Sequence, residues 1–413
     1  MNAAATESAA GGSAATESAA TESAKARRRV LFYVQHMLGI GHLKRAATLS
    51  RAFEKAGFAV TMVSGGFEVP GIDAGGAAFV QLEAVRAADR TFTGLVDSDH
   101  REIDDGLRDA RRRKLLDVFD RVKPGIVITE LFPFGRRQLR FEILPLLEAA
   151  RAARPRPFIV SSVRDILVEP SRDSRVTDMV ENFERFYDLV LVHGDPDLIP
   201  FEATFALMDR IKDRLRYTGY VVEAPAGKGG RRAAGAGEVI VSAGGGALSE
   251  PLLAAALAAR KLTRLNEATW RLLAGHALAE DAFRRLARAA GDGVIVERAR
   301  PDFTTLLANC ALSISQGGYN TVMELLAAGA RGVIAPYAGG KETEQTLRAR
   351  LLQKRCAVQV VWEDDIGPEA IARAADAALL GPPLGAAGID TDGAAASARI
   401  LGTLVAHGAP ITA

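Results

Sequence analysis

The chain alternates short apolar runs with stretches of helical periodicity, and this alternation constrains the fold more than any other feature. Residues 30–35 (VLFYVQ) form an apolar, β-branched and aromatic run typical of a buried strand. Residues 43–56 place apolar side chains on one helical face, Gly57 ends that helix, and residues 58–63 are again strand-like. Strands that alternate with helices form mostly parallel sheets with helices on both faces. The sequence therefore predicts an α/β protein with doubly wound sheets.

The alternation continues in two series. The first contains further strand candidates at 78–82, 126–129, 158–161 and 189–193, with helical stretches at 99–122 and 142–153. The second contains strand candidates at 239–242, 269–274, 294–297, 312–315, 333–336 and 358–362, with helices at 248–260, 281–290, 320–328 and 344–354. Between the two series, residues 224–237 are rich in Gly, Ala and basic residues, which indicates a linker.

The 413 residues are enough for two or three domains, and the pattern favours two. Residues 1–27 are expected to be a disordered tail, because they repeat Ala-Thr-Glu-Ser units and bury little apolar surface. The remaining division is an N-terminal α/β domain, the linker, a C-terminal α/β domain, and a Gly/Pro-rich loop with a last helix: 28–223, 224–237, 238–380 and 381–413.

Charge and cysteine content exclude several classes of protein. Lys plus Arg is 52 and Asp plus Glu is 50, so the net charge of +2 argues against a nucleic-acid binder. Two cysteines cannot form a disulfide framework or a cysteine zinc cluster, and they fit a reducing cytoplasm. No apolar run reaches the roughly 20 residues of a transmembrane helix. The basic run 111–114 is expected to be a solvated helix face, with attraction to an anionic membrane surface as the alternative.

Ligands of open α/β sheets bind beyond the carboxyl ends of the strands, so the segment after each strand is a candidate site. The first such segment contains Gly39, Gly41 and His42. The glycines allow a tight turn, and a neutral imidazole in the first helical turn can take a proton from an acceptor hydroxyl. Lys44 stands where the dinucleotide fingerprint needs its third glycine. An equally weighted alternative is a glycine-rich turn with a structural histidine.

The second segment follows the strand at 239–242 and contains Gly244, Gly245 and Gly246. Successive glycines expose backbone N–H groups that can hold phosphate oxygens. The segment lacks the Lys-Ser/Thr ending of a Walker loop, which argues against nucleotide hydrolysis by that route. A plain turn is the alternative.

The third segment runs from Ser315 through two glycines into a helix that begins near Asn320. That helix N-terminus can accept a pyrophosphate, and Glu324, about one turn further on, can reach a ribose diol. Glu344 and Gln345 follow the next strand and suit sugar hydroxyls. Each piece alone could be capping and turn chemistry. At successive junctions of one sheet, they favour a nucleotide-sugar site.

Weaker polar candidates follow other strands of the first domain. Glu130 ends one strand, Arg164 and Asp165 follow the next, and His193 ends another. All four could line an acceptor site. The neighbouring pair Arg164 and Asp165 is more often structural than catalytic.

Together, these motifs resemble bacterial glycosyltransferases related to family 28, a group that itself resembles the UDP-N-acetylglucosamine transferase of peptidoglycan lipid II synthesis. The resemblance extends from residue 28 to about residue 380. Its main pieces are Gly39-Ile-Gly-His42, the segment 315–321, Glu324 and Glu344-Gln345, with further matches at 132–137, 163–166, 192–195 and 217–220. The peptidoglycan enzyme has a richer glycine run before its histidine and a Gln-Gln pair where this chain has Glu344-Gln345.

The resemblance implies the GT-B architecture, in which two Rossmann-like doubly wound parallel-sheet domains face a cleft. The N-terminal domain would then bind the acceptor and the C-terminal domain the nucleotide sugar. His42 matches the histidine of the family's Gly-His motif. Glu324 would bind the ribose, and Glu344 and Gln345 the sugar. The residues implied to touch the donor diphosphate are Gly244, Gly245, Gly246, Gly317, Gly318, Tyr319, Asn320 and Thr321.

We therefore expect transfer of a hexose or N-acetylhexosamine from a UDP-sugar to an acceptor hydroxyl, with His42 as base, inversion at the anomeric carbon and no metal or other cofactor. A nucleotide-sugar hydrolase or 2-epimerase and a non-catalytic nucleotide-sugar-binding protein are the alternatives. The acceptor is open among a lipid, a polysaccharide and a small metabolite. No nucleic-acid partner is expected. A cytoplasmic location is expected, and peripheral contact with the inner face of the membrane is left open.

Overall fold

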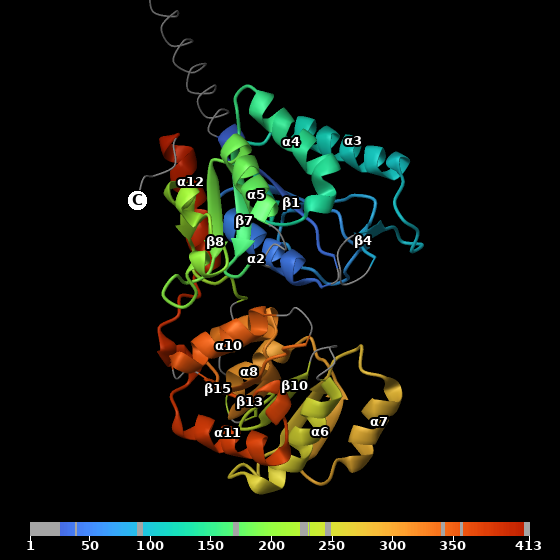
Figure 1. The fold of residues 1–413 in the computed structure, drawn as a ribbon, viewed down its shortest axis with the longest axis vertical. Helices are drawn as coiled ribbons and strands as arrows, with labels where there is room; N and C mark the ends of the chain where they lie inside the picture. Colours follow the sequence, from blue (N-terminus) through green and yellow to red (C-terminus); the bar gives the residue numbers. More distant parts are fainter. Residues whose placement is uncertain are drawn as a thin grey trace, which may run out of the picture. The chain divides into compact units, whose positions relative to one another are not determined.

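A computed structural model describes residues 25–37, 39–88, 94–167, 173–223, 230, 232–243, 249–339, 343–355 and 358–408. The chain forms two compact units, each built on its own parallel sheet (Figure 1). Unit 1 comprises Met1–Gly194, Phe201–Val221 and Asp392–Ala413, and unit 2 comprises Asp195–Pro200 and Val222–Thr391. Half of the predicted linker, residues 224–229 and 231, is outside the described residues.

Unit 1 contains a seven-stranded parallel sheet in the order β3-β2-β1-β6-β7-β8-β9. Its strands are β1 (Arg29–Val34), β2 (Ala59–Ser64), β3 (Ala78–Gln81), β6 (Ile126–Glu130), β7 (Phe158–Arg164), β8 (Leu189–His193) and β9 (Leu215–Tyr217). A small antiparallel pair joins β4 (Arg86–Ala87) to β5 (Leu95–Val96). The helices are α2 (Gly41–Lys55), α3 (Asp105–Val122), α4 (Arg140–Ala152), α5 (Asp173–Phe186) and α12 (Gly393–His407), with short 3-10 turns η1 (Arg137–Leu139), η2 (Phe201–Ala203), η3 (Met208–Arg210) and η4 (Lys212–Arg214).

The strands of this sheet are apolar on both faces, as parallel strands between helix layers must be. Leu31 and Tyr33 of β1 face one core, which α3, α4 and α5 cover. Val30 and Phe32 face a second core, which α2 and the C-terminal helix α12 cover. Helix ends follow the local sequence: the Asp104 carboxylate accepts a hydrogen bond from Leu107 N at 2.8 Å and begins α3.

Unit 2 contains a six-stranded parallel sheet in the order β12-β11-β10-β13-β14-β15. Its strands are β10 (Val239–Ala243), β11 (Trp270–Ala274), β12 (Val294–Arg298), β13 (Leu312–Gln316), β14 (Gly332–Ala335) and β15 (Val358–Val360). The helices are α6 (Ser249–Ala259), α7 (Glu280–Ala289), α8 (Phe303–Asn309), α9 (Tyr319–Ala328), α10 (Glu344–Lys354) and α11 (Pro368–Leu380), with 3-10 turns η5 (Arg260–Leu262), η6 (Glu363–Asp365) and η7 (Leu384–Ala387). Helices α6, α7 and α11 pack on one face of the sheet.

The two sheets confirm the predicted fold class of two doubly wound parallel α/β units. Both sheets have the strand order of the Rossmann fold. In each, three strands are added in turn on one side of the sheet, and the later strands are added on the other side of the first strand. This switch point lies between β1 and β6 in unit 1 and between β10 and β13 in unit 2. Among the described residues, no helix is long and apolar enough to cross a membrane.

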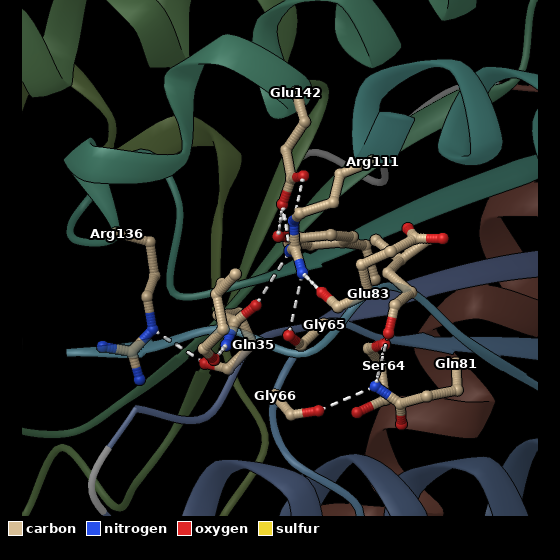
Figure 2. A network of polar contacts seen from close by, with 12 residues as sticks. Gln35, Ser64, Gly65, Gly66, Gln81, Glu83, Arg111, Arg136 and Glu142 are labelled. Atoms are coloured by element: carbon tan, nitrogen blue, oxygen red, sulfur yellow. Dashed lines mark hydrogen bonds and ion pairs between the residues drawn. The ribbon is translucent and has the colours of Figure 1, made fainter. Parts of the chain in front are cut away.

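The expectation that residues 111–114 form a solvated face is wrong for Arg111, whose side chain is fully buried. Its guanidinium pairs with Glu142 on α4, with Nη2 and Oε1 2.7 Å apart, and it also donates to backbone oxygens of Gly65 and Glu83 (Figure 2). The Tyr33 hydroxyl donates to the same Glu142 oxygen at 2.5 Å. This network joins α3 and α4 to β1. Helical periodicity cannot predict that one arginine of a basic run points into the core, because its partner Glu142 lies on another helix.

Candidate functional site

The candidate site of unit 1 lies at its switch point, where β1 and β6 end side by side. His42 is the second residue of α2, after Gly41, and Gly39 lies just before the helix. Glu130 is the last residue of β6 and is fully buried. The structure therefore brings together two of the residues predicted for this domain.

His42 and Glu130 form a hydrogen-bonded pair. His42 Nδ1 is 2.9 Å from Glu130 Oε1, and Arg45 forms an ion pair with the same carboxylate. The other oxygen, Oε2, accepts a hydrogen bond of 2.6 Å from the Ser162 hydroxyl at the end of β7. The His42 side chain keeps 16% of its surface exposed, whereas that of Glu130 keeps none. The imidazole thus lies between a buried carboxylate and the surface of the unit.

The electrostatics of the pair keep the imidazole neutral and the carboxylate ionised. Burial, together with Arg136 and Arg45, lowers the pKa of His42 to about 3, against the opposing effect of Glu130. For Glu130, burial raises the pKa, but the charge of Arg45 and the hydrogen bonds from His42 and Ser162 outweigh it and hold the pKa well below its usual range. A neutral imidazole whose Nδ1–H points at a carboxylate carries its lone pair on Nε2. This is the arrangement of a general base.

The other candidates of unit 1 have different surroundings. His193 ends β8 and is fully buried, with Nε2 2.9 Å from the Ser162 Oγ. Asp165 is also buried and accepts hydrogen bonds from the Tyr220 hydroxyl at 2.8 Å and from Ile166 N at 2.9 Å, which are structural contacts. Arg164 is the last residue of β7 and is partly buried.

The candidate site of unit 2 lies between the ends of β10 and β13. Gly244, Gly245 and Gly246 follow β10 and are outside the described residues. Gly317 and Gly318 lead from β13 into α9, but their N–H groups donate to Ala335 O at 3.3 Å and Gln316 O at 2.9 Å. The amides that this turn offers to a ligand are those of the first turn of α9: Tyr319, Asn320 and Thr321.

Two buried hydroxyls lie near the carboxyl ends of β10 and β13. Ser242 of β10 and Ser315 of β13 are register partners on neighbouring strands. Among the described residues, neither hydroxyl has a hydrogen-bond partner. Buried polar atoms without partners are uncommon in native structures, and such atoms at a strand end are consistent with a ligand-binding edge.

The candidates for ribose and sugar contacts lie on the two helices that follow. Glu324 is partly buried in the second turn of α9. Glu344 begins α10 and pairs with Arg348, with Oε1 and Nη1 3.1 Å apart. The Gln345 side-chain oxygen accepts a hydrogen bond of 3.2 Å from Tyr337 N. These two side chains are thus held by protein contacts at the edge of the sheet.

Sequence reasoning missed Arg45, Ser162 and Arg348. Arg45 lies one turn after His42 on the same helix, a spacing that can be read from the sequence. Arg348 lies one turn after Glu344, is almost fully buried, and places its guanidinium 5.0 Å from the centre of the Tyr319 ring. Ser162 carries no local signal, because its partner Glu130 is on another strand. Among the described residues, no group of three or more His, Cys, Asp or Glu side chains could hold a metal ion.

Comparison with known family models gives one match, in unit 2. Residues 239–385 match the glycosyltransferase family 28 C-terminal domain, a stretch that contains the whole sheet of unit 2. Unit 2 thus carries a family 28 domain, as predicted from the motifs around Gly317 and Glu344. The family is shown for this domain alone, and the chain as a whole shares the GT-B fold of the solved glycosyltransferases described next.

Solved structures with the same fold match more than nine tenths of the chain. The calicheamicin glycosyltransferase CalG4 matches with a TM-score of 0.58 and 17% identity, over 92% of this chain and 99% of that one. The glycosyltransferase SnogD from Streptomyces nogalater matches with a TM-score of 0.58 and 18% identity, over 91% and 99%. MurG from Acinetobacter baumannii matches with a TM-score of 0.53 and 13% identity, over 91% and 99%.

Proposed function

We propose that this protein transfers a glycosyl group from a nucleoside diphosphate sugar to an acceptor hydroxyl, with His42 as the general base. The observation that carries the proposal is the pair of His42 and Glu130 at the switch point of unit 1. A neutral imidazole with a carboxylate behind it can accept the hydroxyl proton as the oxygen attacks. The family 28 domain of unit 2 supports a glycosyl donor as the second substrate.

In the proposed reaction, the acceptor oxygen forms a bond to the anomeric carbon while the bond from that carbon to the diphosphate oxygen breaks. The acceptor proton passes to His42 Nε2, and the nucleoside diphosphate leaves with the electron pair of the broken bond. Direct attack of this kind inverts the anomeric centre. The amides at the start of α9 and the orphan hydroxyls of Ser242 and Ser315 would stabilise the charge of the leaving diphosphate. No metal is assigned a role.

The finer assignment is a UDP-sugar donor with a hexose or N-acetylhexosamine. One of the similar structures, the spinosyn rhamnosyltransferase SpnG, is described as a complex with thymidine diphosphate (TM-score 0.54, 16% identity). The nucleotide therefore has to be tested together with the sugar. A panel of UDP- and TDP-sugars is screened by thermal shift, because a ligand that binds only the folded state raises its apparent stability. The best donor is then used to find acceptors in cell extract.

The test of the base is His42→Ala. Transfer should fall by about 100-fold or more, the usual contribution of a general base, while the donor still shifts the melting temperature. His276→Ala, an exposed histidine of unit 2, is the matched control and should keep both properties. Transfer by His42→Ala at the wild-type rate would contradict the assignment.

Two further measurements decide between the alternatives. Incubation of the donor without acceptor should give little turnover, whereas fast release of free sugar or a new epimer would identify a hydrolase or 2-epimerase. Binding of a donor with no turnover by any acceptor fraction would identify a non-catalytic binding protein. Addition of EDTA should leave transfer unchanged, and a loss restored by Mg²⁺ would contradict the metal-independent mechanism.

A further inference from the structure

A chain of buried hydrogen bonds extends from Glu130 away from His42. The Ser162 Oγ is 2.6 Å from Glu130 Oε2 and 2.9 Å from His193 Nε2, and His193 Nδ1 is 2.9 Å from the Thr218 Oγ1. Glu130, Ser162 and His193 end the neighbouring strands β6, β7 and β8, and Thr218 directly follows β9. All four side chains are essentially inaccessible to solvent. The proposed mechanism so far uses only Glu130.

The numbers of donors and acceptors fix the direction of the first two hydrogen bonds from Glu130. An ionised carboxylate can only accept, so Ser162 spends its single hydroxyl hydrogen on Glu130. The Ser162 oxygen can then only accept from His193, which must carry a hydrogen on Nε2. If His193 is neutral, its Nδ1 has a lone pair and accepts from the Thr218 hydroxyl. All the donors in the chain then point towards Glu130.

An alternative exists for the last link. The Thr218 hydroxyl is also 2.8 Å from Gly219 O and can donate there instead. His193 would then donate from both nitrogens and would be an imidazolium. The ring is fully buried, and burial with the nearby Arg45 lowers the pKa of His193 to about 3 against the effect of Glu130. The neutral form with Nε2–H is therefore favoured.

The first oxygen of Glu130 fixes His42 in the opposite way. His42 Nδ1 is 2.9 Å from Glu130 Oε1 and 3.1 Å from Arg45 Nη2. An Nδ1 lone pair could accept from Arg45, but it would then face a carboxylate oxygen at 2.9 Å with no hydrogen between them. Arg45 already pairs with that carboxylate. In the Nδ1–H form, His42 and Arg45 can both donate to the Glu130 carboxylate, so this form is favoured.

We propose that Ser162, His193 and Thr218 are positioning residues that orient Glu130, so that one carboxylate holds His42 and His193 in opposite tautomers. The catalytic consequence rests on the proposed function, whereas the tautomer pair does not. By donating to Oε2, Ser162 prevents rotation of the carboxylate and limits its basicity. His193 keeps the Ser162 hydrogen directed at Glu130. This assigns to His193 an indirect role behind Glu130, in place of the acceptor contact expected from sequence.

The direct test uses the wild-type protein at pH 7 and needs no substrate. Histidine is labelled with ¹⁵N, and long-range ¹H–¹⁵N correlation shows which ring nitrogen of each histidine carries the proton. The chain has 6 histidines, so His42→Gln and His193→Gln variants assign the two signals by their disappearance. We expect His42 to be protonated on Nδ1 alone and His193 on Nε2 alone. The same tautomer at both sites, or a doubly protonated His193, would overturn the proposal.

The second test asks whether the hydrogen bonds from Ser162 and His193 contribute to the reaction. Ser162→Ala should reduce kcat by about 10-fold or more with little change in KM for the donor, because it disturbs the base and leaves donor binding intact. Without the Ser162 donor, the Glu130 carboxylate becomes more basic and holds a proton on His42 more strongly. The acid limb of the pH profile of kcat should therefore move to higher pH, with Arg45 and Arg136 still opposing protonation of His42.

Conservative variants separate positioning from simple loss of structure. Ser162→Thr keeps the hydroxyl and should retain most of the activity that Ser162→Ala loses. His193→Gln keeps an N–H donor and should retain most of the activity that His193→Phe loses. The control is Ser50→Ala, a buried serine of α2 outside the chain. An unshifted pH profile in Ser162→Ala with wild-type tautomers would overturn the positioning role. Failure of the proposed function would look different, since His42→Ala would then retain transfer whatever the tautomers are.

Discussion

At the scale of single residues, the chemistry of unit 1 depends on how one buried carboxylate shares its two oxygens. Glu130 Oε1 faces His42 and Arg45, and Oε2 faces Ser162. With Arg45 as its ion partner, the carboxylate stays ionised despite complete burial. The carboxylate accepts from His42 directly and from His193 through Ser162, so it influences which ring nitrogen of each histidine carries the proton. This dependence has a consequence for stability as well as for activity.

We predict that unit 1 loses stability as pH falls from 6.5 towards 3. The ordinary pKa of histidine is 6.5, and that of folded His42 and His193 is about 3, so in this window the unfolded chain binds protons that the folded chain does not. Each histidine should contribute about 1.4 kcal/mol per pH unit, and Glu130 adds a loss of the same sign at the acid end.

His193→Gln tests this prediction, because it removes one of the histidines whose pKa is lowered by burial in unit 1. Unfolding in urea, followed by hydrogen exchange of peptides from β8, should show a slope against pH that is smaller by up to about 1.4 kcal/mol per unit. His100→Asn is the control, since His100 is exposed in the same unit and has a φ of 63°, which asparagine tolerates. An equal slope in wild type and His193→Gln would contradict the prediction.

The sequence could locate Glu130 and His193 because each ends an apolar strand, and His42 because it starts the helix after one. It could not show that they share one network. His42 and Glu130 are 88 positions apart, and only the order of strands brings β6 next to β1. Ser162 was missed for the same reason. A serine at a strand end has no distinctive pattern until the neighbouring strand is known.

At the scale of elements, the network around Arg111 explains how α3 and α4 are held on β1. The helix pair covers an apolar face, yet Arg111, Glu142 and Tyr33 beneath it are fully buried. Figure 2 shows the Arg111 guanidinium directed at the Glu142 carboxylate. Burial and the Glu142 charge raise the pKa of Tyr33 well above its ordinary value, so its hydroxyl stays a donor. The arrangement is fully bonded, and loss of one partner leaves a buried charge.

We predict that Glu142→Gln destabilises unit 1 by about 3–5 kcal/mol, the usual cost of leaving one ion of a buried pair unpaired. Glu148→Gln is a matched control on the same helix, because Glu148 is 57% exposed and pairs with Arg185 at the surface. It should cost less than about 1 kcal/mol. Urea unfolding monitored by hydrogen exchange of α3 and α4 peptides measures both. Similar effects of the two variants would contradict a structural role for the buried pair.

Periodicity predicted most of the strands and most of the helices, with ends that differ from the structure by a few residues. It missed α5, α8 and α11. Helix α8 has only 7 residues, fewer than two complete repeats of a helical pattern. Helix α11 (PEAIARAADAALL) owes most of its apolar face to alanine, which gives little contrast with its neighbours. Short or alanine-rich helices are fixed by packing against a sheet more than by their own pattern.

At the scale of the whole molecule, the C-terminal helix α12 belongs to unit 1, together with the N-terminal part of the chain. Helix α12 packs against the same core as α2, and Val221 pairs with Asp392 where the chain re-enters unit 1. A Cβ on Gly393 would lie 2.3 Å from Gly219 O, so only glycine fits at this entry. The sequence predicted a last helix at its end, but no local pattern assigns such a helix to a core formed mainly by residues of the first half of the chain.

We predict that Leu401→Ala loosens unit 1 and leaves unit 2 unchanged. Leu401 of α12 is fully buried in the core that α2 covers, and deletion of a buried leucine side chain costs about 2–5 kcal/mol. Hydrogen exchange by mass spectrometry should therefore speed up in peptides of α2 and β1, although these lie at the opposite end of the sequence. Leu253→Ala, a fully buried leucine of α6, is the reciprocal control and should act on the sheet of unit 2. If Leu401→Ala changed exchange only within α12 itself, the helix would not contribute to the stability of unit 1. A variant that ends at residue 391 would then keep unit 1 folded.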